Sequence, residues 1–300
     1  MAESPKPSYE DSGLVQGHNA QLDKEWLEVN LVLEAIYQCY GYDFRQYGKA
    51  SIKRRLQHHL ARTGLPHISS LIPYVLHNPE AFRALFFDIS VTVTEMFRDP
   101  WFFRALREKV LPVLATFPYI NIWQAGCATG EETYSLAIML KEEGLYERSR
   151  IYATDFNDGA LEKAKSRIYS QERMREFSQN YQRAGGKLSL ADYYHARYQS
   201  VIFNADLQRN ITFANHNLAT DGVFAEMHLV ICRNVLIYFD RHLQDRVLTM
   251  FRDSLCHNGI LCLGSKESLL FSAVKPDFRE FLEAEKIYQR KLPTSSPKNA

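Results

Sequence analysis

Two glycines and two glutamates follow an apolar run that predicts a buried strand. The run covers 119–125, and Gly126 and Gly130 precede Glu131 and Glu132 at the start of a predicted helix. Glycines in such a strand-to-helix turn let a cofactor approach the backbone, although a turn that only needs positive φ would select them equally. The glutamates would oppose a phosphate at this helix N-terminus. The carboxylates instead suit a ligand that carries ammonium or hydroxyl groups.

Asp155 ends the next predicted strand, 150–154, in the region where an acidic residue accepts hydrogen bonds from the ribose of a nucleoside cofactor. The same residue could instead cap a helix N-terminus, although Asn157 or Asp158 could do that as well. A cofactor with ribose hydroxyls, an ammonium and a sulfonium, but no phosphate, is S-adenosylmethionine. Glu131, Glu132 and Asp155 together therefore favour S-adenosylmethionine.

Two asparagines and a tyrosine also stand at the ends of predicted strands. Asn217 follows the apolar run 211–214, and both Asn234 and Tyr238 follow the strand 228–232. Ligands of parallel α/β sheets bind outside the carboxyl ends of the strands, so these side chains are placed to line a crevice. Taken alone, Asn234 could be a turn residue and Tyr238 a core residue.

The elements that would position these residues alternate between strand and helix after residue 118. This alternation indicates βαβ units and a mainly parallel sheet of the α/β class. A polar, tyrosine-rich segment of about 170–210 interrupts it and is expected to be either an insertion with its own structure or an ordered excursion of the chain. The run 281–290 could add a final antiparallel edge strand. The predicted strands are 119–125, 150–154, 228–232 and 259–264, and the predicted helices are 131–143, 158–167 and 241–255.

A helical unit precedes this domain. Apolar residues recur at spacings of three and four between 22 and 87, which indicates amphipathic helices. The helix 49–63 is expected to bury Ile52, Leu56 and Leu60 and to leave its cations in solvent. Charge alone favours a solvated face here over a docking surface for an acidic partner. Between Phe44 and Pro79 the sequence has no acidic residue, and its basic residues are Arg45, Lys49, Lys53, Arg54, Arg55 and Arg62.

The chain has 300 residues, of which 46% are hydrophobic and 24% charged, and its formal net charge is +1. This composition indicates a globular fold, and the balanced charge argues against general nucleic-acid binding. Because no run suits a membrane span or a signal peptide, we expect a cytoplasmic protein without membrane insertion. The cysteines are expected to be reduced thiols, and no spacing indicates a metal site. The polar ends, 1–20 and 293–300, are expected to be disordered.

Five motifs occur in a fixed order along the chain. They are 92–100 (TVTEMFRDP), 125–132 (AGCATGEE), 153–155 (ATD), 217–218 (NL) and 232–240 (CRNVLIYFD). Together they closely resemble the CheR family, the chemoreceptor glutamate methyltransferases of bacterial chemotaxis. The resemblance runs from the basic helix to about residue 290. It implies an α/β, Rossmann-like S-adenosylmethionine methyltransferase domain with a small all-helical N-terminal domain and an inserted subdomain.

The resemblance also implies domain boundaries and site residues. The helical domain would cover 21–87 and the methyltransferase domain 88–292. In CheR-like enzymes the segment before the sheet folds over the cofactor, S-adenosyl-L-methionine, which leaves as S-adenosyl-L-homocysteine. Arg98 and Tyr238 would border the transferred methyl group as catalytic residues. The implied cofactor-binding residues are Thr92, Thr94, Arg98, Gly126, Glu132, Asp155, Asn217, Leu218, Asn234 and Val235.

The implied reaction moves a methyl group to glutamate side chains of methyl-accepting chemotaxis receptors and gives methyl esters. The cytoplasmic helices of these receptors are acidic, so a cationic helix would help to dock them, and we expect a monomer. One alternative is an S-adenosylmethionine methyltransferase that acts on another protein or a small carboxylate. Another is a non-catalytic, cofactor-sensing, receptor-binding module, against which Arg98 and Tyr238 argue. The partner-binding residues would be Lys53, Arg54, Arg55 and Arg62.

Overall fold

The structure is a computed structural model that describes residues 16–90 and 92–292. It forms two compact units, one of them helical, and the other containing Gln46–Gly48 and the residues from Ser90 onward. Most of the two predicted tails lies outside the described residues. Residues 16–20 belong to helix α1 (Gln16–Tyr40), which corrects the disorder expected for them. Within the described residues, no helix has the length and apolar character needed to span a membrane.

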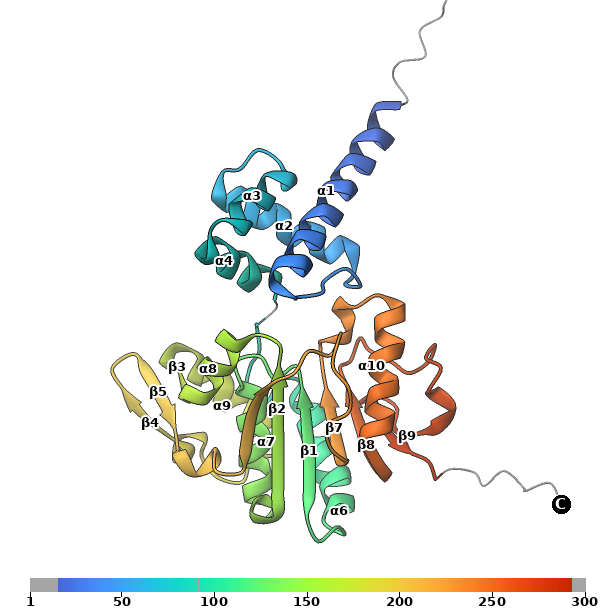
Figure 1. The fold of residues 1–300 in the computed structure, drawn as a ribbon. Helices are drawn as coiled ribbons and strands as arrows, with labels where there is room; N and C mark the ends of the chain where they lie inside the picture. Colours follow the sequence, from blue (N-terminus) through green and yellow to red (C-terminus); the bar gives the residue numbers. More distant parts are fainter. Residues whose placement is uncertain (1–15, 91, 293–300) are drawn as a thin grey trace, which may run out of the picture. The chain divides into compact units, whose positions relative to one another are not determined.

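The helical unit is built on amphipathic helices with a shared core. Helix α2 buries Ile52 and Leu56 as expected, but it buries His59 in place of Leu60, which is only half-buried. Asp88 explains the difference, because its Oδ2 lies 2.5 Å from His59 Nδ1 and gives the buried ring a polar partner. The elements of this unit are α1 (Gln16–Tyr40), α2 (Lys49–Thr63), the 3-10 turn η1 (Ile68–Ser70), α3 (Leu71–Leu76) and α4 (Pro79–Ile89) (Figure 1).

The cations of α2 are not all left in solvent, which corrects the expectation. The Lys53 side chain is 15% exposed and pairs with Glu25 on α1. Arg55 donates to the backbone carbonyl of Asp88, and Arg62 Nη1 lies 2.7 Å from the Asp88 carboxylate. These side chains therefore tie α2 to α1 and α4, while Arg54 is exposed.

The second unit is a mixed seven-stranded sheet, which confirms the expected α/β class. Its strand order is β6-β2-β1-β7-β8-β10-β9, with parallel pairing from β6 to β8 and antiparallel pairing from β8 to β9. The order reverses at β1, so β2 and β7 flank the strand that precedes the glycine turn. The strands are β1 (Ile120–Ala125), β2 (Ser149–Asp155), β6 (Ile211–Asn215), β7 (Met227–Cys232), β8 (Leu255–Leu263), β9 (Phe278–Leu282) and β10 (Ile287–Arg290).

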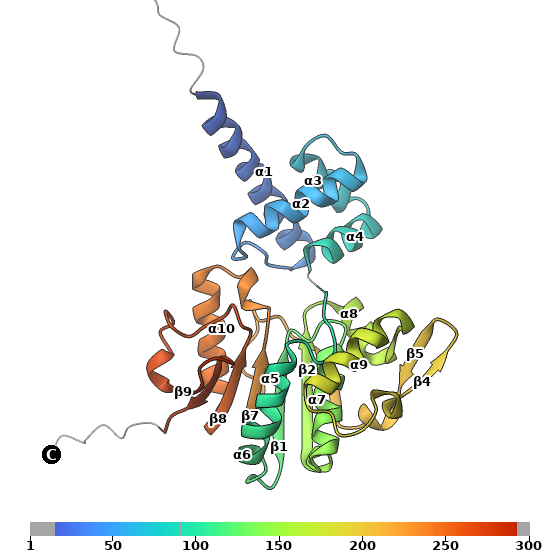
Figure 2. The same ribbon diagram turned by 180° about the vertical axis from the view of Figure 1, so that it is seen from behind.

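Helices cover both faces of this sheet. Alternate residues of β1 point to opposite faces, so Ile122 joins the core under α7, whereas Trp123 packs edge-on against Phe251 of α10. Figures 1 and 2 show α10 on one face and α5, α6 and α7 on the other. The helices are α5 (Pro100–Ala105), its π-helical continuation η2 (Leu106–Val110), α6 (Leu111–Leu114), α7 (Glu131–Glu142), α8 (Asp158–Ser166), α9 (Met174–Arg183) and α10 (Arg241–Ser254).

The C-terminal end of the sheet differs from the single edge strand expected over 281–290. The chain forms a hairpin there, in which β10 lies between β8 and β9. The turn is closed by a hydrogen bond from Lys286 N to Glu283 O, and Lys286 has a φ of 57°. A polar turn inside the run thus splits it into two strands and leaves β9 at the edge.

The segment between β3 and β6 has its own structure, as expected of an insertion. A small antiparallel sheet of order β3-β5-β4 accompanies α9. Glu142 of α7 ties this segment to the main unit, because its buried carboxylate accepts hydrogen bonds from Tyr193 Oη at 3.0 Å and Arg107 Nη2 at 2.6 Å. The remaining elements are β3 (Ile168–Ser170), β4 (Tyr194–Arg197), β5 (Ser200–Phe203) and the 3-10 turns η3 (Tyr146–Arg148), η4 (Gln171–Arg173), η5 (Leu190–Tyr193), η6 (Ala205–Leu207), η7 (Leu236–Tyr238) and η8 (Lys275–Asp277).

Candidate active site

The glycine turn after β1 needs glycine for two separate reasons. Gly126 and Gly130 have φ values of 75° and 87°, in the left-handed region. A Cβ on Gly126 would also lie 2.5 Å from Cγ2 of Val235, and a Cβ on Gly130 would lie 2.8 Å from Cβ of Ala164. The turn therefore packs closely against the loop after β7 on one side and against α8 on the other.

A recess of about 50 Å³ opens beside this turn, at the carboxyl ends of β1 and β7. Its volume exceeds the roughly 30 Å³ of one water but is far below that of ordinary ligand pockets. A nucleoside cofactor would therefore extend beyond this recess. The recess brings together seven predicted site residues, Thr94, Arg98, Gly126, Glu132, Asn234, Val235 and Tyr238, and its other lining residues are Val93, Gln124, Cys127, Ala128 and Arg233.

Glu132 puts a nearly buried carboxylate on the wall of the recess. Its Oε2 accepts from Arg233 Nη1 at 2.7 Å, and its Oε1 accepts from Gln124 Nε2 at 3.3 Å. A carboxylate has about four lone-pair positions, so these two bonds leave acceptor capacity for an ammonium group. The donor set at this point therefore fits the methionine end of S-adenosylmethionine.

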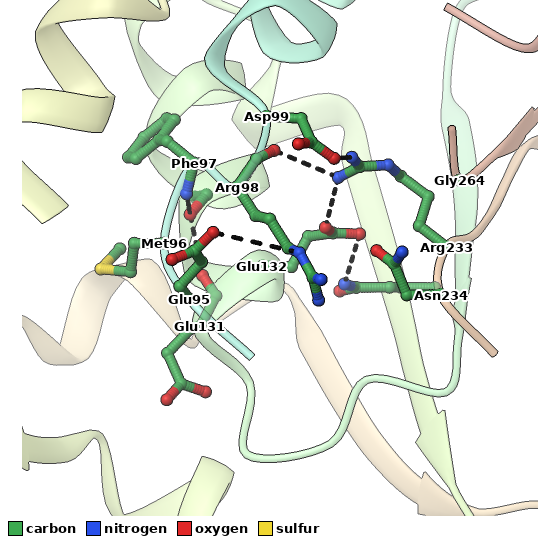
Figure 3. A network of polar contacts seen from close by, with 12 residues as sticks. Glu95, Met96, Phe97, Arg98, Asp99, Glu131, Glu132, Arg233, Asn234 and Gly264 are labelled. Carbon is green, nitrogen blue, oxygen red and sulfur yellow. Dashed lines mark hydrogen bonds and ion pairs between the residues drawn. The ribbon is translucent and has the colours of Figure 1, made fainter. Parts of the chain in front are cut away.

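Arg233 is the central polar residue of the recess, and the sequence analysis gave it no role. Its side chain is 1% exposed, and its guanidinium lies 4.0 Å from the centre of the Phe102 ring. Besides Glu132, it contacts Asp99 Oδ2 at 2.5 Å and the backbone carbonyl of Arg98 at 3.3 Å (Figure 3). A buried arginine at the end of β7 thus links the glycine-turn helix to the segment that carries Arg98.

Arg98 and Tyr238 reach the recess from different parts of the unit. The Arg98 side chain is 37% exposed, and its Nε lies 3.9 Å from Glu95 Oε1. Tyr238 ends the turn η7, and its backbone carbonyl accepts a hydrogen bond from Gly48 N at 2.7 Å. Both side chains line the same recess as Glu132, so the two predicted catalytic residues are neighbours of the predicted ammonium ligand.

A buried glutamate shapes the loop between Asn234 and Tyr238, and it was also absent from the sequence predictions. Glu267 accepts backbone hydrogen bonds from Asn234 N at 3.0 Å and Val235 N at 2.9 Å, with a longer one from Ile237 N. Burial raises the pKa of Glu267, against the effect of these amide donors. Asn234 has a φ of 61°, and the glutamate holds this strained turn in place. In the sequence, the only indication of this role is an acidic residue shortly after Gly264, at the end of a predicted strand.

Asp155 lies at the end of β2 but does not line the recess. Its Oδ2 accepts from Ala128 N at 2.8 Å and its Oδ1 from Asn157 N at 2.9 Å, and burial raises its pKa. It does not cap α8, because Asn157 does so by accepting from Ala160 N. Asp155 therefore supports the glycine turn from the neighbouring strand.

The other predicted cofactor residues also lie outside the recess wall. Asn217 follows β6, and its Oδ1 accepts from Ala219 N at 3.0 Å. Leu218 is buried in the core under α10. Thr92 is half-buried beside Val93, which does line the recess and is 80% exposed. A contact between these residues and the cofactor requires the ligand to extend along the sheet edge beyond the recess.

The sheet order, the glycine turn and the carboxylate on α7 define a Rossmann-like, S-adenosylmethionine-dependent methyltransferase. The family model described as the CheR methyltransferase SAM-binding domain matches residues 92–284, and the model of the CheR all-alpha domain matches residues 27–90. The chain therefore belongs to the CheR methyltransferase family, as the sequence motifs indicated, and its cofactor is S-adenosylmethionine.

Named relatives agree with this assignment. A protein of Pseudomonas putida, named as a candidate methyltransferase Cher3, is 51% identical over 264 residues, which cover 88% of this chain and 97% of the relative. A chemotaxis protein methyltransferase of Vibrio parahaemolyticus is 29% identical over 82% of this chain and 90% of its own length. One of Listeria innocua is 26% identical over 83% of this chain and 92% of its own length.

Proposed function

We propose that the protein transfers the methyl group of S-adenosylmethionine to glutamate side chains in the cytoplasmic helices of chemoreceptors and produces methyl esters. The observation that carries this proposal is the meeting of Arg98, Glu132 and Tyr238 at one recess, in a chain of the CheR family. The relatives named as chemotaxis protein methyltransferases support chemotaxis as the process.

The chemistry asks for positioning rather than for proton transfer. The bound cofactor supplies a methyl group that its sulfonium makes electrophilic. A glutamate has an ordinary pKa of about 4.3 and is ionised near neutral pH, so the chain needs no general base to activate it. The chain must instead hold the carboxylate oxygen in line with the methyl carbon and keep water away from both.

Each side chain of the recess has a proposed part in this task. The Tyr238 hydroxyl donates a hydrogen bond to the substrate carboxylate and orients it, and the half-exposed Arg98 attracts the carboxylate to the rim. Glu132 accepts the methionine ammonium. Asp155 would hold the ribose, and Asn217 with Leu218 would flank the adenine. The remaining contacts come from Thr92, Thr94, Gly126, Asn234 and Val235.

The proposed docking surface for the acidic receptor helix is narrower than the sequence suggested. Lys53 and Arg55 make contacts within the helical unit, where Lys53 pairs with Glu25 and Arg55 donates to the Asp88 carbonyl. Arg54 is exposed, and Arg62 keeps 59% of its side chain exposed although it pairs with Asp88. We therefore assign the attraction of the receptor mainly to Arg54, with a smaller part for Arg62.

The proposal is tested by incubating the protein with methyl-labelled S-adenosylmethionine and receptor-containing membranes, then measuring base-labile methyl esters. Arg98→Ala and Tyr238→Phe should each lower the rate by about tenfold or more, because each removes a group that acts at the reacting carboxylate. Tyr119→Phe is the matched control, since Tyr119 is exposed just before β1 begins, at the opposite edge of the sheet.

The wild type and Tyr119→Phe should label receptors equally. Full methyl transfer by both Arg98→Ala and Tyr238→Phe would contradict the assigned roles. Label on other proteins or on small carboxylates, with none on receptors, would overturn the substrate, and cofactor binding without any transfer would show a sensing module instead.

A further inference from the structure

The segment 94–99, here called the strap, carries two residues to the recess without being a helix or strand. Thr94 and Arg98 line the recess, while Met96 and Phe97 between them are fully buried. Phe97 and Asp99 have φ values of 51° and 56°, which are uncommon for residues with a side chain. Such a backbone persists only where its surroundings hold it, so the contacts of the strap decide where Arg98 points.

Side chains from other elements bind alternate carbonyl groups of the strap. Arg173 Nη2 donates to Thr94 O at 2.6 Å, and Asn180 Nδ2 donates to Met96 O at 3.3 Å. Arg233 Nη1 donates to Arg98 O at 3.3 Å. In addition, Phe97 N donates to Ser135 Oγ on α7 at 2.9 Å. These side chains take the place of the backbone partners that a regular element would supply.

The two arginines that bind the ends of the strap are each held by one of two consecutive glutamates. Glu132 Oε2 binds Arg233, and Glu131 Oε1 binds Arg173 Nη1 at 2.9 Å. Consecutive residues of a helix point about 100° apart, so the first turn of α7 supports the strap on two sides. Figure 3 shows Glu131 and Glu132 diverging in this way below the strap.

The contact between Arg173 and Glu131 differs from an ordinary surface ion pair. The Glu131 side chain is 3% exposed, and burial raises the pKa of this carboxyl, while the hydrogen bond from Thr129 and the charge of Arg173 oppose the change. Arg173 also stacks over the Phe177 ring, with 4.6 Å between the guanidinium carbon and the ring centre. Arg173 ends η4, so a residue of the insertion reaches the backbone of a recess-lining residue.

We propose that Arg173, supported by Glu131, is a positioning residue that fixes the Thr94 end of the strap and thereby orders the cofactor site and Arg98. This inference rests on the proposed function only in taking the recess as the cofactor site. It gives the insertion a part in cofactor binding, and it separates two glutamates that the sequence analysis treated as a pair. Glu132 acts at the recess, and Glu131 acts through Arg173.

The test compares Arg173→Ala with Arg175→Ala, because Arg175 is an exposed arginine on the adjacent helix α9. Calorimetric titration with S-adenosylhomocysteine should give a Kd raised about tenfold for Arg173→Ala and unchanged for Arg175→Ala. Arg173→Lys should recover only part of the affinity, since a compact ammonium lacks the fixed, planar arrangement of donors with which the guanidinium reaches Glu131 and Thr94 O together. Glu131→Gln should weaken binding in the same direction as Arg173→Ala.

A second measurement separates positioning from general stability. Hydrogen exchange in the folded, ligand-free protein should become faster at the amide of Phe97 in Arg173→Ala, while the temperature of global unfolding stays close to that of Arg175→Ala. If Arg173→Ala is too unstable to purify, Arg173→Lys and Glu131→Gln are compared with Arg175→Ala in the same two measurements. Wild-type affinity and unchanged exchange in the strap would overturn the inference.

The outcome is independent of the receptor assay, because binding of S-adenosylhomocysteine needs no receptor. A wild-type protein that binds S-adenosylhomocysteine but methylates no receptor would refute the proposed function and leave the strap inference to be decided by the Arg173 variants. Receptor methylation by Arg173→Ala with wild-type kcat and cofactor KM would refute the inference and leave the proposed function intact.

Discussion

Gly126 decides how closely the glycine turn can approach the loop after β7. Two constraints select glycine at this position. Its φ is positive, and a Cβ there would lie 2.5 Å from Val235 Cγ2. Gly144, with a φ of 68° and no atom near the position of a Cβ, has the first constraint alone. A comparison of the two glycines therefore separates the effect of backbone strain from the effect of lost space beside the recess.

We expect Gly126→Ala to destabilise the protein by about 1–3 kcal/mol more than Gly144→Ala, since only the first adds overpacking to the strain of a positive φ. The added methyl group also pushes Val235 from the wall of the recess, so the Kd for S-adenosylhomocysteine should rise. Urea unfolding and calorimetric titration measure the two effects. Equal stability and equal affinity of the two variants would show that the turn has room for a side chain.

Glu267 gives a pH dependence with a defined sign. Burial raises the pKa of its carboxyl in the folded protein, so the folded protein binds this proton more tightly than the unfolded chain does. The stabilisation from protonation is complete below the unfolded pKa of about 4.3 and is lost as the pH rises through the folded pKa. Glu267→Gln has no such proton.

The unfolding free energy of the wild type minus that of Glu267→Gln should therefore decrease as the pH rises from about 4 toward neutrality. Urea unfolding at a series of pH values measures it. Glu280→Gln, at an exposed position of β9, should show no comparable trend. If the wild-type value minus the variant value instead increases with pH, the backbone amides lower the folded pKa of Glu267 below its unfolded value.

The sequence placed three polar residues at strand ends, because parallel strands end at one edge of the sheet. Of Asn217, Asn234 and Tyr238, which were expected to line one crevice, Asn234 and Tyr238 line the recess and Asn217 does not. Arg233 and Glu267 were missed because their roles depend on partners far away in the chain. Arg233 binds a carboxylate 101 residues earlier, and Glu267 binds amides about 30 residues earlier.

At the scale of elements, α2 shows how a charge run can be divided between two tasks. Arg55 binds the carbonyl of Asp88 at the end of α4, whereas Arg54 is exposed. A sequence pattern cannot make this division, because it depends on which helix packs against each face. The same packing placed His59 rather than Leu60 in the core, through Asp88.

We expect Arg54→Ala to raise the KM for receptor several-fold at low salt, with the effect fading at high salt, because it removes a screened attraction. Its unfolding free energy should change by less than about 0.5 kcal/mol. Arg55→Ala should instead cost about 1 kcal/mol of stability by removing a hydrogen bond to the backbone. Receptor kinetics at several salt concentrations and urea unfolding check both. A salt-independent KM in wild type and Arg54→Ala alike would contradict the docking role.

The buried strands were predicted well because runs such as 228–232 are apolar on both faces, as strands of a covered parallel sheet must be. The hairpin of β9 and β10 was less predictable. A turn of four residues divides a run that reads as a single strand in the sequence. The pairing of β10 with β8 then places β10 within the sheet and β9 at its edge. The insertion was predicted only as an interruption, because its small sheet has short, mostly polar strands.

At the scale of the whole molecule, the net charge of +1 is the sum of charged groups that make different local contacts. Cations of α2 hold the helical unit together, with Arg54 left exposed. Paired carboxylates and arginines hold the strap of the methyltransferase unit. This chain of the CheR family thus combines a helical unit that carries exposed cations with an α/β unit whose recess is lined by the Glu132 carboxylate.

The most direct test of the central claim is mass-spectrometric mapping of receptors after incubation with the protein and S-adenosylmethionine. We predict base-labile methyl esters on glutamates of the cytoplasmic receptor helices with the wild-type protein and with Tyr119→Phe. These esters should be strongly reduced with Tyr238→Phe. Unmodified receptor glutamates, together with methyl groups on another acceptor or on none, would contradict the account.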